Sequence, residues 1–166
     1  MNKILYIPIF HIDTNLINTN SKNDEMNKLE QWDKDGVIQI IMSGVSYNEA
    51  KATNYVPRIN KTNQHIYTLT DVEIDENNPS FHIISIALFP NGIKDDNQKN
   101  DVKIVYEAMY YNAILITLDG NSKKQPGGIL GNREKIKNIV QIMNPKEAVQ
   151  FIEKKIEEHY KLLIKK

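Results

Sequence analysis

Short apolar segments alternate with helical segments along this chain, and no other feature limits its fold as strongly. Apolar runs occupy residues 4–12, 37–42, 113–118 and 139–143. Helical patterns occupy residues 23–34 and 46–55, a stretch that begins at Asn100 or Asp101, and the segment that Pro145 opens. Strands that are apolar on both faces are typical of parallel sheets covered by helices. We therefore predict an α/β fold, a three-layer α/β/α sandwich with a mainly parallel central sheet.

Length and composition are those of an ordinary globular chain. It has 166 residues, of which 40% are hydrophobic and 25% charged, so we expect one compact domain over residues 1–166. The 21 basic and 21 acidic residues cancel, and overall charge therefore gives no argument for nucleic-acid binding. The absence of Cys excludes disulfides and thiolate metal sites and fits a reducing cytoplasm.

No apolar run reaches the ~20 residues that a membrane span requires. Residues 1–10 are apolar but contain Pro8, lead directly into polar residues and lack a small-residue cleavage site. We interpret them as a first core strand and not as a signal peptide. We expect a cytoplasmic protein with no membrane partner, and the abundance of Asn, Lys and Ile indicates an AT-rich, bacterial genome.

Residues 58–100 form an atypical segment within this pattern. Residues 66–72 look partly strand-like, and residues 81–89 fit either a short helix or a strand. Residues 94–100 are polar, and we predict that they are exposed.

Acidic residues lie at the ends of two predicted strands and in the helix that follows a third. Asp13 ends the first apolar run, Asp119 ends the run 113–118, and Glu49 lies in the first turn of the helix after the run 37–42. Ligand sites of parallel α/β sheets form at the carboxyl ends of the strands, so these three acids should share one edge. We place Asp101 in the first turn of the helix that leads into residues 113–118. It joins the others only if that helix begins at the same edge, which the sequence leaves open.

Four carboxylates in one cleft repel one another strongly. Each pair at ~4 Å costs about 4 kcal/mol at an effective dielectric constant near 20. Such a cluster requires a cation, and an all-oxygen ligand set favours hard ions such as Mg²⁺ or Mn²⁺. One or two such ions can activate water and stabilise the leaving oxygen of a phosphodiester.

Four segments resemble, in order, the motifs of PIN-domain nucleases. Residues 12–17, with Asp13, Thr14 and Asn15, resemble the opening motif, and residues 46–49 resemble the second acidic element. Residues 100–108, with Asp101 near their start, resemble the third. Residues 112–119 resemble the fourth, in which a Thr lies two residues before the acid.

The resemblance implies a PIN-like fold, Mg²⁺ or Mn²⁺ as cofactor, and endoribonuclease activity on single-stranded RNA. It makes Asp13, Glu49, Asp101 and Asp119 the catalytic metal ligands, with Asn15 and Thr117 supporting them by hydrogen bonds. If the chain follows the commonest bacterial members, it is the toxin of a toxin–antitoxin pair, silenced by an antitoxin-type protein. The family also often forms homodimers, through helices that occupy the region of residues 58–100.

Each acid also has a purely structural interpretation. Asp13 could cap the turn after its strand, and Asp119 could serve a turn with the Gly that follows it. Ser46 and Glu49 have the spacing of a capping box, in which the Glu reaches back to the cap amide. Asp101 could complement a helix dipole. All four interpretations could hold together, and only the joint position of the acids favours a shared site.

Basic residues beyond Asp119 are candidates for holding the phosphate backbone, although a solvated loop explains them equally well. They are Lys123, Lys124 and Arg133. The histidines show no metal-ligand spacing, and we read them as core or surface residues without an assigned role. They are His11, His65, His82 and His159.

Two other functions remain open at this stage. The first is a PIN-like module, with weak or no catalytic activity, that binds RNA or a protein partner. The second is a phosphatase of the aspartyl-nucleophile class. That class requires a second Asp two residues after the first, where this chain has Asn15.

Overall fold

The computed structural model describes residues 7–17, 23–52, 68–70, 72–120 and 127–164. Five strands form one sheet: β1 (Ile9–Ile12), β2 (Gln39–Ser43), β3 (Thr68–Thr70), β4 (Ile114–Ile116) and β5 (Ile142–Met143). Their order is β3-β2-β1-β4-β5, and every neighbouring pair is parallel. The predicted parallel sheet is confirmed.

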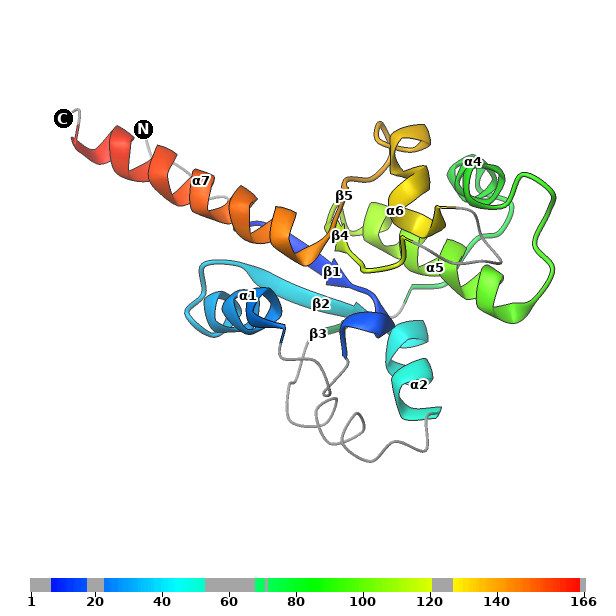
Figure 1. Cartoon of the computed structure of the whole chain (residues 1–166). Helices are drawn as coiled ribbons and strands as arrows, with labels where there is room; N and C mark the ends of the chain where they lie inside the picture. The colour runs from blue at the N-terminus through cyan, green and yellow to red at the C-terminus, as the bar shows by residue number, and fades with distance from the viewer. Residues whose placement is uncertain (1–6, 18–22, 53–67, 71, 121–126, 165–166) are drawn as a thin grey trace.

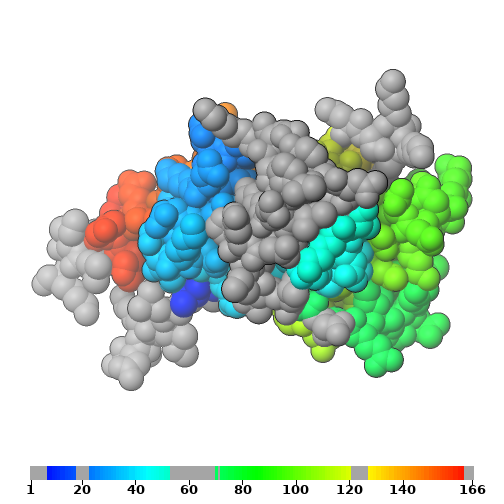
Figure 2. Space-filling model, turned by 90° about the horizontal axis from the view of Figure 1, so that it is seen from below, coloured from blue at the N-terminus to red at the C-terminus, as the bar shows by residue number. Residues whose placement is uncertain are grey.

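Helices cover both faces of the sheet (Figure 1). They are α1 (Asp24–Lys34), α2 (Gly44–Ala52), α4 (Pro79–Leu88), α5 (Asp96–Tyr110), α6 (Gly128–Asn132) and α7 (Pro145–Ile164). Side chains of α1 and α7 share one buried cluster with Phe10 and Ile12 of β1, whereas α4, α5 and α6 share the other with Leu115 of β4. Figure 2 shows α1 and α7 toward one end of the molecule, α4 and α5 toward the other, and α2 between them. The three-layer α/β/α sandwich is therefore confirmed.

Successive side chains of β1 lie on opposite faces of the sheet, with Phe10 and Ile12 on one face and His11 on the other. Phe10 and Ile12 pack toward α1 and α7, because successive side chains of a strand point to opposite sides. His11 lies between them in the sequence, points to the other face and has none of its surface exposed. Asp13 follows His11 by two residues, which places it on the same side just beyond the strand.

Helix α5 begins earlier than its apolar pattern predicted. Its N-cap is Asp95, whose side chain accepts a hydrogen bond from the Gln98 amide. The predicted start at Asn100 or Asp101 is therefore wrong, since an Asp at the cap position outweighed the polar character of residues 96–100. Asp101 consequently lies in the second turn of the helix and not in the first.

Helix α2 also begins before the predicted Ser46. The Ser46 amide donates to Ser43 Oγ over 2.8 Å, so Ser43 satisfies an otherwise unpaired amide at the helix start. The capping-box interpretation of Ser46 and Glu49 is therefore wrong.

The atypical segment is partly helical where the structure describes it. Residues 81–89 fall in α4 up to Leu88, and Pro79 opens this helix at a position where its missing amide hydrogen is not needed. Within the predicted strand-like stretch, residues 68–70 form β3, and residues 58–67 lie outside the described residues. None of the described helices is both long and apolar enough to cross a membrane.

Candidate active site

The carboxyl ends of β1 and β4 bring Asp13 and Thr117 together. The Asp13 amide donates to the carbonyl of Ile116, the last residue of β4, over 3.1 Å, which continues the pairing one residue beyond β1. Asp13 Oδ2 then accepts a hydrogen bond of 2.7 Å from Thr117 Oγ1 and another of 2.7 Å from Asn15 Nδ2. The Asp13 side chain does not act as the N-cap of the short turn Thr14–Leu16. Its carboxylate is held by Thr117, beyond β4, and by Asn15 within that turn.

Asn15 and Thr117 connect Asp13 to the rest of this edge. Asn15 Nδ2 lies 3.1 Å from Thr117 Oγ1, and Asn15 Oδ1 accepts from the Leu118 amide over 3.2 Å. Thr117 Oγ1 also accepts from the Asp119 amide over 2.9 Å. One threonine hydroxyl therefore contacts the carboxylate of one acid and the backbone of another.

Glu49 projects from α2 into the same region and is held by two neutral donors. Its Oε2 accepts from Thr14 Oγ1 over 2.8 Å, and its Oε1 accepts from Asn100 Nδ2 over 2.7 Å. The second bond joins α2 to α5 directly. It shows that the N-terminal half of α5 lies at the carboxyl edge of the sheet, the point that the sequence left open for Asp101.

Asp119 is held by the start of α6. Its Oδ2 accepts from the Ile129 amide over 2.9 Å, and its carbonyl oxygen accepts from the Leu130 amide over 2.9 Å. Gly128 makes this close approach possible, because it has a positive φ of 55° and a Cβ there would lie 2.6 Å from Asp119 Oδ1. The Asp119 carboxylate is thus fixed by a helix that itself requires glycine.

The pKa values show that the four acids share one electrostatic field. Burial, followed by repulsion from Asp13, Asp119 and Glu49 and then Asp95, raises the pKa of Asp101 to about 8. Burial is also the largest cause that raises the pKa of Asp13 to about 6, and Asp119 and Glu49 add to it. The hydrogen bonds from Thr117 and Thr14 act in the opposite direction on Asp13. The structure therefore brings together all four acids that the sequence singled out.

Nothing positive compensates this charge in the part of the chain that the structure describes. None of its Lys or Arg side chains forms an ion pair with any of the four acids. Asp101 makes no hydrogen bond with a described residue either, so its carboxyl is the least constrained of the four. A carboxylate cluster of this kind has the donor chemistry that a hard divalent cation requires.

The four carboxylates are not already arranged around one metal-ion position. Among the described residues, no three His, Asp or Glu side chains are arranged to hold a single metal ion. The oxygens of Asp13, Glu49 and Asp119 are instead held by neutral donors. The donor set fits a metal ion chemically, and the unconstrained Asp101 is the side chain best able to adjust to one.

Of the three basic residues that we named as candidates for holding the phosphate backbone, the structure describes only Arg133. Lys123 and Lys124 lie outside the described residues. Arg133 binds both carboxylate oxygens of Glu147, at 2.7 and 3.1 Å, so its charge is already paired. That pair raises the pKa of Arg133 through its hydrogen bonds to Glu147. A phosphate contact by these three residues stays a prediction.

Two residues of this edge were not assigned a role from the sequence. Thr14 and Asn100 each hold one oxygen of Glu49. Asn100 was read as a helix cap because the start of α5 was placed too late. Each is the immediate neighbour of a predicted acid, and that adjacency is the only signal the sequence offered.

Fold and site together define a parallel α/β protein with an acidic cluster at the carboxyl edge of its sheet. No protein-family model and no curated protein matches the chain. Among solved structures, it is similar to a chain of the crystal structure of VapBC2 from Rickettsia felis bound to a DNA fragment from their promoter. The two are 20% identical, the match covers 82% of this chain and 98% of that chain, and the TM-score is 0.46. At this level the likeness carries no functional information.

The Gly128→Ala variant tests the support of Asp119. The added Cβ would meet Asp119 at 2.6 Å in a backbone conformation that L-residues avoid, so we expect a loss of about 2–4 kcal/mol in the free energy of unfolding. Urea denaturation measures it. Gly131→Ala is the matched control, since a Cβ there meets nothing within 4 Å. Equal stability of the two variants would contradict the close approach.

The Asp101→Asn variant tests the mutual repulsion of the acids. The pKa of Asp101 in the folded state, about 8, lies above the ordinary value of 3.8 for an aspartate in an unfolded chain. Its contribution to stability is therefore complete below about pH 4 and lost as the pH rises through 8. Without divalent ions, we expect Asp101→Asn to be more stable than wild type by about 2 kcal/mol at about pH 9 and to lose this advantage on acidification. Denaturation at several pH values measures the difference.

Asp96→Asn provides the control for this pH series. Asp96 is an exposed acid in the first turn of the same helix, where it complements the dipole. Its replacement should cost up to about 1 kcal/mol at pH 9. A wild type as stable as Asp101→Asn at pH 9 would show that the acids do not repel one another in the folded chain.

Proposed function

We propose that this protein is a divalent-metal-dependent endoribonuclease that hydrolyses phosphodiester bonds of single-stranded RNA. One observation carries the proposal: four carboxylates from separate segments of the chain share one electrostatic field without a compensating described cation. A stable fold retains such repulsion where function requires it. The PIN-like order of the motifs in the sequence supports the same reaction class.

Asp13, Glu49, Asp101 and Asp119 are the residues that would hold Mg²⁺ or Mn²⁺. A bound ion of this kind supplies positive charge to the phosphate oxygens and to the leaving oxygen of a phosphodiester. The neutral donors keep the carboxylates oriented: Thr117 and Asn15 hold Asp13, and Thr14 and Asn100 hold Glu49. No side chain acts as a covalent nucleophile in this proposal.

Partner proteins belong to the proposal as well. If the chain acts as the toxin of a toxin–antitoxin pair, an antitoxin-type protein covers this edge and silences it. The helices through which the family often forms homodimers would correspond here to α4 and the first turns of α5. We propose that this pair acts in the cytoplasm of a bacterium and that the toxin is a homodimer.

A rival function is a PIN-like module that binds RNA or a protein without cleaving. The observation that favours it is the lack, among the described residues, of three side chains already arranged around one ion. Thermal stabilisation separates the two, because an ion that binds only the folded state adds about 2.7 kcal/mol at one hundred times its Kd. A nuclease site should show such a shift with millimolar Mn²⁺, and a binding module should show none.

Cleavage of labelled single-stranded RNA in the presence of Mn²⁺ tests the activity. We expect cleavage by wild type and a loss of about 100-fold or more in Asp13→Asn and in Asp101→Asn, because each loses a charged metal ligand. Gel electrophoresis of the products and circular dichroism of each variant measure activity and folding. Asp96→Asn is the control and should cleave as wild type does. Equal cleavage by all four proteins would place the activity elsewhere or in a contaminant.

A further inference from the structure

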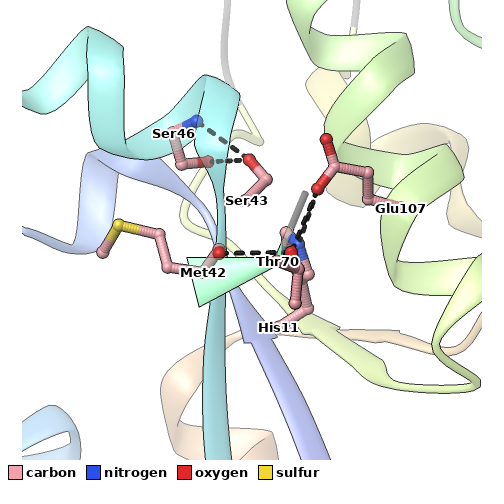
Figure 3. Close-up of polar contacts among 6 residues, drawn as sticks. All are labelled: His11, Met42, Ser43, Ser46, Thr70 and Glu107. Carbon is pink, nitrogen blue, oxygen red and sulfur yellow. Dashed lines mark hydrogen bonds and ion pairs between the residues drawn. The ribbon is translucent and has the colours of Figure 1, made fainter. Parts of the chain in front are cut away.

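A second group of polar side chains lies buried beneath the acidic edge, between α5 and the sheet (Figure 3). Glu107 of α5 faces Thr70 of β3 and His11 of β1, and these residues are 3%, 5% and 0% exposed. None of the three belongs to the proposed metal ligands. His11 was assigned no role from the sequence, and Glu107 was not among the acids singled out there.

The contacts of Glu107 tie the helix to two strands. Thr70 Oγ1 lies 3.2 Å from Glu107 Oε2 and 3.2 Å from the Met42 carbonyl oxygen, so its single hydroxyl proton serves the carboxylate or the backbone of β2. Glu107 Oε2 also lies 3.8 Å from His11 Nε2, and neither ring nitrogen of His11 has a hydrogen-bond partner among the residues that the structure describes. One carboxylate oxygen of α5 therefore lies close to side chains of both β1 and β3.

Burial of a carboxylate is, as a rule, a poor source of stability. Removing it from water is costly, and well-packed apolar residues in place of a buried charged group are often neutral or stabilising. An apolar side chain, however, tolerates small translations of a helix across a sheet, whereas a hydrogen bond to a fixed hydroxyl does not. A buried polar contact of this kind can specify position at the expense of stability.

The geometry of α5 connects Glu107 with the acidic edge. Glu107 follows Asn100 by seven residues, which is close to two helical turns, so both lie on the same stripe of the helix. Asn100 contacts Glu49 at one level, and Glu107 contacts Thr70 about 10 Å further along the axis. Asp101 is adjacent to Asn100, and any sliding of α5 would change its separation from Asp13.

We propose that Glu107 is a positioning residue that, through Thr70 and His11, sets where α5 lies along the sheet and so fixes the spacing between Asp101 and the other three acids. The relevance of this spacing to metal binding rests on the proposed function. The positioning itself does not, because it concerns the separation of Asp101 from Asp13 in the protein without a metal.

Mn²⁺ binding, measured by isothermal titration calorimetry, provides the first test. Glu107→Leu should fold with a Tm at or above that of wild type, yet bind Mn²⁺ at least about tenfold more weakly. Glu107→Gln, which still accepts a hydrogen bond from Thr70, should recover most of the affinity. Thr70→Val removes the hydroxyl with little change in shape and should weaken binding as Glu107→Leu does. The Thr70→Val variant keeps the test decisive if Glu107→Leu fails to fold.

Val105→Ala is the control, because it loosens α5 in the apolar core without touching the polar contacts. It should lower the Tm and leave the Kd for Mn²⁺ within about twofold. Unchanged affinity in Glu107→Leu and Thr70→Val, or equal weakening by Val105→Ala, would overturn the positioning role.

A metal-free double-mutant cycle separates this proposal from the proposed function. Asp101→Asn should raise the Tm at about pH 9 by less in the Glu107→Leu background than in wild type, because a displaced helix relieves the repulsion. Equal shifts in both backgrounds would contradict the positioning role even if wild type binds Mn²⁺. A smaller shift in a protein that binds no Mn²⁺ would retain the positioning role and reject the metal-dependent nuclease.

Discussion

Repulsion among four carboxylates at one edge of a parallel sheet is the constraint on which the rest of this structure depends. Asp101 experiences it most strongly, because its pKa reflects burial and the charges of Asp13, Asp119 and Glu49 together. The surrounding donors are neutral, so they orient the carboxylates without removing their charge. The edge therefore remains electrostatically unfavourable among the described residues, and the cation affinity that we propose would follow from this arrangement.

The rest of the fold supplies the rigidity that this edge requires. Two apolar clusters, one on each face of the sheet, hold the strands whose ends carry Asp13 and Thr117. Short-range geometry then completes the site, as in the approach of Asp119 to Gly128. Among the described residues, Asp101 of α5 is the one acid of the four without a hydrogen bond to hold it, and we propose that contacts further along α5 set its position.

The parallel sheet and three of the four acids could be predicted from the sequence alone. Apolar runs mark strands that are buried on both faces, and the rule that sites form at their carboxyl ends located Asp13, Glu49 and Asp119. The place of Asp101 could not be predicted in this way. It depends on how α5 packs across the sheet, and tertiary contacts such as that between Asn100 and Glu49 decide this.

The errors have the same physical origin. The helix was expected to begin at Asn100 or Asp101 because the residues before them are polar, although the cap at Asp95 starts it earlier. His11 and Glu107 lie 96 residues apart in the sequence, and nothing local to either one signals the other. The burial of both side chains depends on the tertiary packing of α5 against the sheet.

The most direct measurement of the central claim is a carbon-13 NMR titration of the Asp101 carboxyl group, first without divalent ions and then with saturating Mg²⁺, which is diamagnetic. We predict a titration near pH 8 without the ion, in line with the raised pKa, and a shift to well below neutrality when Mg²⁺ is bound. An ordinary titration near pH 4 that Mg²⁺ leaves unchanged would contradict both the shared field of the four acids and their role as metal ligands.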